Sequence, residues 1–408
     1  MDRKKLPYTR GYATIDLDAV AYNMEQMKAN LPKDIGMMAV VKADGYGHGA
    51  APVAWAADPY VEMYGVASAE EALNLKHHGI SKPILILGPI HHSHYETLIQ
   101  EDIHIPVFTW SQAGGLSAKA LYVGKPALIH LVVDTGMNRI GMRPDKASAD
   151  MAGMIGRLPG IEVKGLFTHF ARADEADKES ALEQIRHYKE FLKMLEDGGT
   201  EIPIKHISNS AGIIDLPEIC DEHFWTGQSR YLVRAGISMY GLYPSNQMSR
   251  EKVCLKPAME LKSFITYIKE IGPGAAVSYG GTFVAKESMT VATVSIGYGD
   301  GYPRNQSGKG YVLIGGRRAA ILGRVCMDQM IVDVSGIPDA REGDIVTLIG
   351  TEGDQQIQVE DLAETGGGFH YEIVCDIGKR IPRVYIKNGK VVGTKDYFQD
   401  VYQEFVRK

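Results

Sequence analysis

The first half of the chain alternates short apolar runs with longer amphipathic segments. Between residues 38 and 240, the runs are rich in Val, Ile and Leu and show little apolar–polar alternation, as is typical of strands buried on both faces. They are Met38–Lys42, Tyr64–Ala67, Ile84–Leu87, Ile105–Phe108, Leu128–Val133, Val163–Thr168, Ile204–Ile207 and Leu232–Ala235. The clearest helical segment between them is Ala176–Leu195, and Ser68-Ala-Glu-Glu71 predicts a capping box at a helix start.

Repeated strand–helix units in this order predict a (β/α)8 barrel. A doubly wound open sheet is the alternative, but no G-x-G-x-x-G follows the first strand. After Tyr243-Pro244 the runs alternate apolar and polar residues, and Gly315-Gly316 has the character of a hairpin turn. We therefore expect a barrel over residues 15–245 and a mostly antiparallel β domain over 246–408.

Composition narrows the class of protein. The chain has 408 residues, 45% of them hydrophobic, which supports two domains with full cores. The net charge is −6 and both signs are interspersed, so the sequence shows no basic cluster of the kind that binds nucleic acids. No apolar stretch is long enough for a membrane span. The four cysteines lie far apart without a C-x-x-C pair, which favours a reduced, cytoplasmic protein. Histidines 91, 92 and 94 fit a solvated surface better than a metal site, so we expect no metal.

Reactive side chains follow the predicted carboxyl ends of the strands, where barrel enzymes perform chemistry. Lys42 ends the first strand, before a glycine-broken turn. Desolvation there would favour a neutral amine that acts as a nucleophile or base, although a lysine at a strand end can also simply extend to solvent. The other strand ends carry Asp134–Arg139, Thr168-His169, Ser208-Asn209-Ser210 and Arg234. This set suits a small, strongly anionic ligand with a carbonyl group.

Pyridoxal phosphate meets this description. Its aldehyde forms a Schiff base with a lysine, its ring nitrogen needs a tuned partner, and its phosphate needs hydrogen-bond donors. Ser210 and the backbone of Gly236-Ile237, beside an expected helix start, suit the phosphate.

The motifs of the chain, in order, closely resemble those of the alanine racemases, which are fold-type III pyridoxal phosphate enzymes. The resemblance covers nearly the whole chain and rests on VVKADGYGHG (40–49), DTGMNRIG (134–141), THFARAD (168–174), SNSAG (208–212), VRAGISMYG (233–241), SYGGTF (278–283), SIGYGDGYPR (295–304), GRVCMDQMIVDV (323–334) and YEIVCDIGKRIPRVY (371–385). It implies a barrel followed by a C-terminal β domain, with residues 1–14 pairing with the β domain. It also implies a head-to-tail homodimer in which each active site takes residues from the partner's β domain.

By this resemblance, Lys42 carries the cofactor and Tyr279, from the other subunit, is the second catalytic base. Arg234 matches the arginine that faces the pyridine nitrogen, with His169 behind it, and Arg139 matches the arginine near the substrate carboxylate. The remaining cofactor-binding positions are Tyr46, Asn209, Ser210, Gly236, Ile237 and Tyr371. Met327 and Asp328 match the substrate-binding segment, and the corridor to the active site is matched by Asp174, Tyr298, Arg304 and Arg324.

The implied function is interconversion of L-alanine and D-alanine by two bases acting on a substrate aldimine, which supplies D-alanine for peptidoglycan. A serine or broad-specificity racemase is an alternative on the same scaffold. A related decarboxylase would want a carboxylate opposite the ring nitrogen, where this chain has Arg234. A non-catalytic pyridoxal phosphate carrier is expected to be a single barrel without the β half.

One position departs from a common family feature. Many members carry a carbamylated lysine in the strand before DTGM, where it orients the arginine that Arg139 matches. Here the aligned residue is Val132, which cannot carry a carbamate. We expect an anion such as chloride, or a polar neighbour such as Asn138, to hold Arg139 instead.

Overall fold

A computed structural model describes residues 8–216 and 229–399, and in this part the chain forms two compact units. The barrel unit contains Ala19–Gly45 and Ala50–Lys256. The β unit combines Tyr46–Gly49 with the N-terminal part of the chain up to Asp18 and the C-terminal part from Pro257. The four-residue segment Tyr46–Gly49 thus belongs to the β unit, although the residues directly before it, up to Gly45, belong to the barrel unit.

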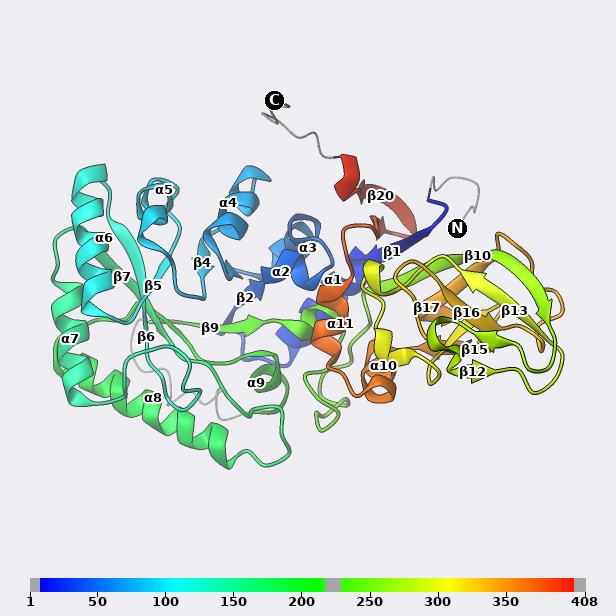
Figure 1. The fold of residues 1–408 in the computed structure, drawn as a ribbon. Coiled ribbons are helices and arrows are strands. Elements are labelled where there is room, and N and C mark those ends of the chain that lie inside the picture. The colour runs from blue at the N-terminus through cyan, green and yellow to red at the C-terminus, as the bar shows by residue number, and fades with distance from the viewer. Residues whose placement is uncertain (1–7, 217–228, 400–408) are drawn as a thin grey trace, which may run out of the picture. The chain divides into compact units, whose positions relative to one another are not determined.

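The barrel unit contains one parallel sheet whose strands follow the order β4-β3-β2-β9-β8-β7-β6-β5 (Figure 1). The strands are β2 (Gly36–Val40), β3 (Met63–Val66), β4 (Ile84–Ile86), β5 (Ile105–Val107), β6 (Ala127–Val132), β7 (Ile161–Phe167), β8 (Ile204–His206) and β9 (Arg230–Ala235). Each overlaps one of the apolar runs, but β2 ends at Val40, so Lys42 does not end this strand as predicted and instead begins the turn that follows it. His104 connects the two edge strands, because its carbonyl accepts from the Ile86 amide (3.1 Å) and its amide donates to the Ile84 carbonyl (2.8 Å). The predicted barrel is therefore confirmed.

Helices cover the outside of these strands (Figure 1). They are α1 (Leu17–Ala29), which begins in the β unit, α3 (Ala50–Ala57), α4 (Ala69–His77), α5 (Tyr95–Gln100), α6 (Trp110–Val123), α7 (Lys146–Gly156), α8 (Glu179–Asp197) and α9 (Ser210–Asp215). The expected helix Ala176–Leu195 corresponds to α8. Inside the barrel, a cluster of Met, Leu, Val and Phe side chains from six strands fills the core, and it comprises Met38, Met63, Leu85, Val132, Phe167 and Leu232.

The β unit is built on a sheet with the order β18-β17-β14-β15-β16-β13-β10-β1-β19-β20. Its strands are β1 (Gly11–Asp16), β10 (Met259–Ile271), β13 (Met289–Val294), β14 (Tyr311–Ile314), β15 (Arg317–Leu322), β16 (Met330–Asp333), β17 (Ile345–Glu352), β18 (Gln355–Ile357), β19 (Arg383–Lys387) and β20 (Lys390–Lys395). The short pair β11 (Ala276–Val277) and β12 (Phe283–Val284) and the helices α10 (Val359–Gly366) and α11 (His370–Asp376) complete the unit.

Most pairings in this sheet are antiparallel, as the alternating pattern predicts. Gly315 and Gly316 form the turn between β14 and β15 with φ values of 57° and 74°, a conformation that favours glycine. The N-terminal strand β1 pairs antiparallel with β10 and parallel with β19. The limits 1–14, 15–245 and 246–408 for independent domains stay a prediction. Within the described residues, no helix has both the length and the apolar character needed to cross a bilayer.

Candidate active site

Lys42 lies in a left-handed turn directly after β2. The turn, α2 (Lys42–Tyr46), holds Ala43, Asp44 and Gly45 at φ values of 52°, 51° and 63°. A left-handed conformation costs an L-residue about 1–2 kcal/mol, so the two non-glycine residues make this segment unfavourable in isolation. Such strain is typical of segments that position a reactive group. The half-buried Lys42 therefore sits where the backbone must be held by other contacts.

Glu71 supplies those contacts. Its carboxylate accepts hydrogen bonds from the backbone amides of Ala43 (2.6 Å) and Ala67 (2.7 Å). The predicted capping box at this helix is therefore wrong in one half. Ser68 caps α4 by accepting from the Glu71 amide (3.3 Å), but the Glu71 side chain does not return to the Ser68 amide. It instead satisfies two amides that lie beyond the ends of β2 and β3.

Arg234, on β9, is buried with 3% of its surface exposed. Its Nη1 donates to Nδ1 and to the carbonyl of His206, both at 3.0 Å. Its Nη2 lies within hydrogen-bond distance of the carbonyls of Thr168 (2.7 Å) and Ile207 (2.9 Å) and of His169 Nδ1 (3.1 Å). Burial lowers the pKa of Arg234 to about 10, so the side chain remains a cation at neutral pH. Among the described residues, the Nε–H has no hydrogen-bond partner.

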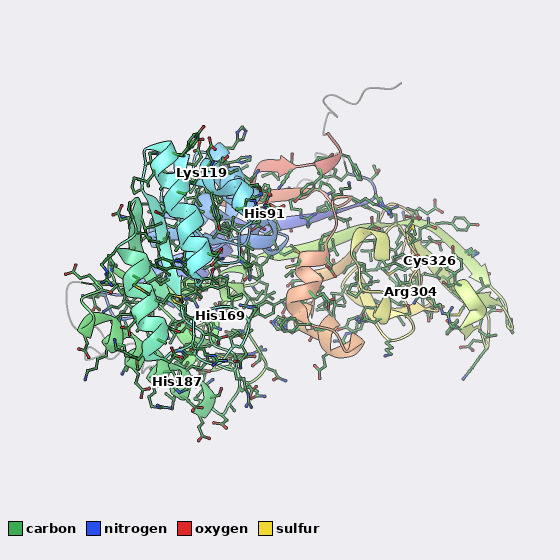
Figure 2. All side chains as sticks on the ribbon, turned by 60° about the vertical axis from the view of Figure 1, so that its left-hand side comes forward. His91, Lys119, His169, His187, Arg304 and Cys326 are labelled. Carbon is green, nitrogen blue, oxygen red and sulfur yellow. The ribbon has the colours of Figure 1, made fainter. Side chains whose placement is uncertain are left out.

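His169 lies in the barrel unit (Figure 2), and Arg234, Arg139 and Lys42 are near enough to act on its ring. Desolvation, followed by the charges of Arg234, Arg139 and Lys42, lowers its pKa to about 3. The ring is therefore neutral, and its Nδ1 accepts from Arg234, which leaves the proton on Nε2. Four side chains from different strand ends are thus close enough to influence one another, as the positions of those ends predict.

The loops after β6 and β7 are ordered by two side chains. Asp134 accepts from the backbone amides of Gly136, Asn138 and Arg139 at 3.0–3.1 Å. The buried Gln184 on α8 accepts from the Ala171 amide and donates to the His169 carbonyl, both at 2.9 Å. These contacts fix the backbone that carries Arg139 and His169.

The Arg139 side chain is exposed and makes no ion pair or hydrogen bond with the residues that the structure describes. The Asn138 Nδ2 donates to the Gly136 carbonyl (3.4 Å), and among the described residues the Asn138 Oδ1 accepts no hydrogen bond from the Arg139 guanidinium, so the expectation that Asn138 holds this arginine is wrong. Val132 is buried in the barrel core.

The segments after β8 and β9 meet at Ser210. The buried Ser210 hydroxyl accepts from the amides of Gly236 (3.0 Å) and Ser238 (3.3 Å). Asn209 caps α9 through its side-chain oxygen, which accepts from the Gly212 amide (3.1 Å). Ile237 begins the short helix that follows Gly236. The structure thus brings together these four residues that sequence reasoning assigned to cofactor binding.

In the β unit, Tyr279 and Met327 line one hollow of about 490 Å³. The other lining residues are Ser278, Gly280, Cys326, Asp328 and Gln329. Tyr279 is 69% exposed and Met327 52% exposed. Arg324 approaches the same segment, since its guanidinium lies 3.1 Å from the position that a Cβ on Gly280 would take. The predicted second base and substrate-binding segment therefore share one surface.

A buried carboxylate holds this surface in place. Asp300 is fully buried and forms ion pairs with Arg10 (2.7 Å) and Arg380 (3.0 Å). Arg380 also pairs with Asp328 (2.8 Å), and Arg10 donates to the Asp328 carbonyl (2.8 Å). The Gly299 amide donates to the Met327 carbonyl (2.9 Å). The loop that carries Met327 and Asp328 is thereby tied to the segment around residues 297–300.

The remaining predicted residues lie in separate groups. Tyr46 and Tyr371 are neighbours in the β unit, with ring centroids 6.3 Å apart, and Phe369 stacks on Tyr371. Tyr298 and Arg304 line a second hollow of about 320 Å³ in the β unit, and Figure 2 places Arg304 and Cys326 in this unit. Asp174 is half-buried in the barrel unit, where its carbonyl accepts from Ser245 (2.5 Å).

Sequence reasoning missed the residues that support the site. Glu71 was assigned to a cap, and Gln184, Asp300, Arg10 and Arg380 carried no signal because their partners are distant in sequence. Asp300 and Arg10, for example, are 290 positions apart. A charged or amide side chain at an otherwise apolar position is the only pattern that could have indicated such roles.

Comparison with known proteins agrees with this geometry. Residues 15–244 match the family model of the alanine racemase N-terminal domain, and residues 258–385 match that of the C-terminal domain. An alanine racemase of Clostridium perfringens strain SM101 is 43% identical over 389 residues, covering 95% of this chain and 98% of the relative. One of Methanococcus maripaludis is 39% identical over 376 residues, covering 92% and 98%.

Solved structures give the same result. The alanine racemase of Clostridium difficile 630 superposes with a TM-score of 0.89 at 37% identity, covering 96% of this chain and 100% of that one. The alanine racemase of Bacillus anthracis with bound L-Ala-P has a TM-score of 0.87 at 34% identity, with 97% and 99% covered. The chain belongs to the alanine racemase family.

Proposed function

We propose that this protein interconverts L-alanine and D-alanine with pyridoxal phosphate as its cofactor. The observation that carries the proposal is the convergence of Lys42, Arg139, His169 and Arg234, since the fields of the other three act on His169. The set combines an amine, two arginine cations and a neutral imidazole at the carboxyl ends of barrel strands. Together with membership of the family, this set supports amino-acid racemisation.

The residues present fit the cofactor. Arg234 is a buried cation whose four Nη hydrogens face protein acceptors, so its Nε–H is the donor that remains for a ring nitrogen. Because an arginine does not release its proton near neutral pH, it would leave that ring nitrogen unprotonated. Ser210 with the amides of Gly236 and Ser238 forms a compact polar group suited to a phosphate. Tyr46 and Tyr371 would add phenolic hydroxyls to the phosphate site.

When bound, pyridoxal phosphate withdraws electron density from the substrate Cα and makes its proton acidic. In our proposal the Lys42 amine exchanges a proton with Cα on one face and the Tyr279 phenol does so on the other, which inverts the configuration. Arg139 and the Met327 backbone amide hold the substrate carboxylate. Asp174, Tyr298, Arg304 and Arg324 line the route to the site.

Chiral chromatography tests the reaction and its specificity. Purified protein with pyridoxal phosphate is offered L-alanine, L-serine and L-lysine separately. We expect fast conversion of alanine alone. Comparable conversion of serine or lysine would replace the proposal with a broad-specificity racemase, and no conversion of any of the three would refute racemisation.

We further propose a homodimer in which Tyr279, Met327 and Asp328 complete the partner's site. The exposure of Tyr279 and Met327 in a single chain supports this arrangement. Lys42→Ala and Tyr279→Phe are each expected to abolish most activity. When the two inactive variants are unfolded together and refolded as a mixture, random pairing in a symmetric dimer restores about a quarter of the activity, because each mixed dimer has one site with both residues intact. No recovery would place both residues of a site in one subunit.

The supply of D-alanine for peptidoglycan in the cytoplasm completes the proposal. Among the described residues, Cys254, Cys326 and Cys375 form no disulfide, as a reducing compartment allows, and Cys220 lies outside the described residues. Immunodetection in fractionated cells tests the location, with recovery in the periplasmic or secreted fraction as the contradicting result.

We also keep the expectation that a small anion orients Arg139. Racemisation in chloride-free buffer should then show a raised KM that added chloride restores. An unchanged KM over the whole chloride range would refute this role.

A further inference from the structure

Three buried histidines form a continuous hydrogen-bonded row inside the barrel. His206 is linked to His130 (Nε2 to Nδ1, 3.0 Å), and His130 is linked to His104 (Nε2 to Nδ1, 3.0 Å). His206 Nδ1 in turn lies 3.0 Å from Arg234 Nη1. His130 and His206 are fully buried and His104 is 6% exposed. The row begins where His104 joins the two edge strands and ends at the arginine of the active site.

The chemistry of arginine fixes the direction of every hydrogen bond in this row. A guanidinium has only donors, so His206 Nδ1 must accept and its proton must lie on Nε2. That proton is donated to His130 Nδ1, which places the His130 proton on Nε2 as well. The same step then assigns the acceptor role to His104 Nδ1. Each neutral ring thus has a single tautomer, and all three bonds point away from Arg234.

Neutral rings are the form that this environment favours. Burial lowers the pKa of His130 and His206 well below the usual value, with Arg234 adding to the effect at His206. Burial lowers the pKa of His104 to about 4. A second proton on any ring would also turn an acceptor into a donor and break the row.

Strand β7 carries two residues that shape the space around the histidine rings, Gly165 and Phe167. Strand β7 lies between β6 and β8, so the His130 ring on β6 must cross it to reach His206 on β8. Position 165 on β7 is glycine, and a Cβ there would lie 2.5 Å from His130 Nδ1 and 2.7 Å from the Ile204 carbonyl. Two residues further along β7, Phe167 stacks on the His206 ring with centroids 4.9 Å apart. Both features leave the rings one position.

We propose that His206, His130 and His104 form one polarised hydrogen-bond row that positions Arg234, with His130 and His104 acting as positioning residues remote from the substrate. The proposal deepens the role of Arg234 and rests on the proposed function for its catalytic consequence. Donation of the His206 Nε2–H to His130 strengthens Nδ1 as an acceptor, because hydrogen bonds in a row polarise one another. The His206 Nδ1 that orients Arg234 therefore depends on His130, which lies two strands away on β6, and on His104 beyond it.

Neutron diffraction from D2O-exchanged crystals of the full chain tests the row directly. We expect one deuteron on each of the three rings, on Nε2 in every case, with or without cofactor. A deuteron on Nδ1 of any of the three, or two on one ring, would overturn the assignment. This result is independent of whether the protein is a racemase.

A matched pair of variants tests the consequence. Asparagine and leucine have similar size and shape, but His130→Asn keeps an oxygen near the position of Nδ1 and His130→Leu does not. We expect His130→Leu to lower kcat for alanine about tenfold with little change in KM, and His130→Asn to retain most of the wild-type kcat. The reason is that the buried His206 Nε2–H loses its acceptor only in His130→Leu.

Stability and the state of His206 separate positioning from packing. The kcat of each variant is measured only under conditions in which urea unfolding shows that the variant is folded. Neutron maps of His130→Leu should show a displaced Arg234 guanidinium or a changed His206 tautomer. Equal kcat in the two variants, or an unchanged His206 and Arg234 in His130→Leu, would refute the positioning role.

Discussion

At the scale of single residues, the Lys42 site depends on a carboxylate that has no part in the proton transfers. The turn after Lys42 places Ala43 and Asp44 in a left-handed conformation. Glu71 offsets this strain by bonding the Ala43 amide, and it also bonds the Ala67 amide after β3. One side chain thus links the backbone beyond the ends of β2 and β3, next to the proposed cofactor site.

We therefore predict that Glu71→Gln impairs catalysis as well as stability. The amide keeps one acceptor oxygen, so one of the two backbone amides loses its partner. The free energy of unfolding in urea should fall by about 1–2 kcal/mol. The kcat/KM for alanine should fall about tenfold.

The matched control is Glu70→Gln, because the neighbouring Glu70 side chain is 71% exposed. This variant should change neither quantity measurably. Equal behaviour of the two variants would show that Glu71 does not hold the Lys42 turn.

At the scale of elements, the apolar runs predicted the barrel strands because a strand covered on both faces must be apolar along its length. The same rule explains why His104, His130 and His206 were missed. His130 and His206 lie inside β6 and β8, where the pattern calls for apolar residues, and His104 forms an isolated bridge just before β5. Only their mutual contacts make the three rings compatible with burial. The sequence also did not show that the Glu71 side chain bonds two amides beyond the strand ends and not the Ser68 amide. The reason is related, because a local pattern does not reveal competing partners from another strand.

Two glycine-to-alanine substitutions should have opposite effects on stability. In Gly165→Ala the new methyl group meets the His130 ring and the Ile204 carbonyl, so overpacking should lower the free energy of unfolding by about 1–3 kcal/mol. Gly114 lies on α6, and in Gly114→Ala the new methyl group meets no atom within 4 Å. The higher helix propensity of alanine should therefore raise the free energy of unfolding by up to about 1 kcal/mol. Urea titrations of both variants check the signs. A neutral Gly165→Ala would mean that the row of histidines has room to move.

The loop carrying Met327 and Asp328 depends on a buried ion pair. Removing the charge of Asp300 takes from Arg10 and Arg380 their buried partner and leaves them with Asp328, and both arginines are partly exposed. Asp300→Asn should therefore lower the free energy of unfolding by about 3 kcal/mol, the lower end for breaking such a pair. The KM for alanine should rise, because the loop holds the proposed substrate contact. A raised kcat with unchanged KM would contradict this.

At the scale of the whole molecule, the two units differ in how far sequence could predict them. The apolar runs predicted the barrel strands, whereas for the β unit the alternating pattern predicted a mostly antiparallel sheet but not the helices α10 and α11. The ion pairs around Asp300 and the pairing of β1 with β10 and β19 join segments hundreds of residues apart, which no local pattern encodes. Motif resemblance supplied most of the site residues, and the supporting contacts emerged only with the fold.

The buried histidines also predict how the whole protein responds to acid. His104 and His169 have pKa values of about 4 and 3, and burial lowers those of His130 and His206 as well. An unfolded histidine titrates near pH 6.5, so below this pH the unfolded chain binds protons that the folded chain does not. The free energy of unfolding should therefore fall as pH decreases from 6.5 towards 4, and stay constant above 7.

The expected size is about 1 kcal/mol for each such histidine between pH 7 and pH 5.5. Carboxylates with lowered pKa values, such as Glu62 beside Arg230, add their effect only at lower pH, below their ordinary value of 4.5. Urea unfolding at pH 7 and pH 5.5 measures the loss. His130→Asn removes one titrating group from the interior, so its loss over this interval should be about 1 kcal/mol smaller than that of the wild type. Equal losses in both proteins would mean that His130 takes up a proton in the folded state over the same pH range as in the unfolded chain, and that second ring proton would break the row that reaches Arg234.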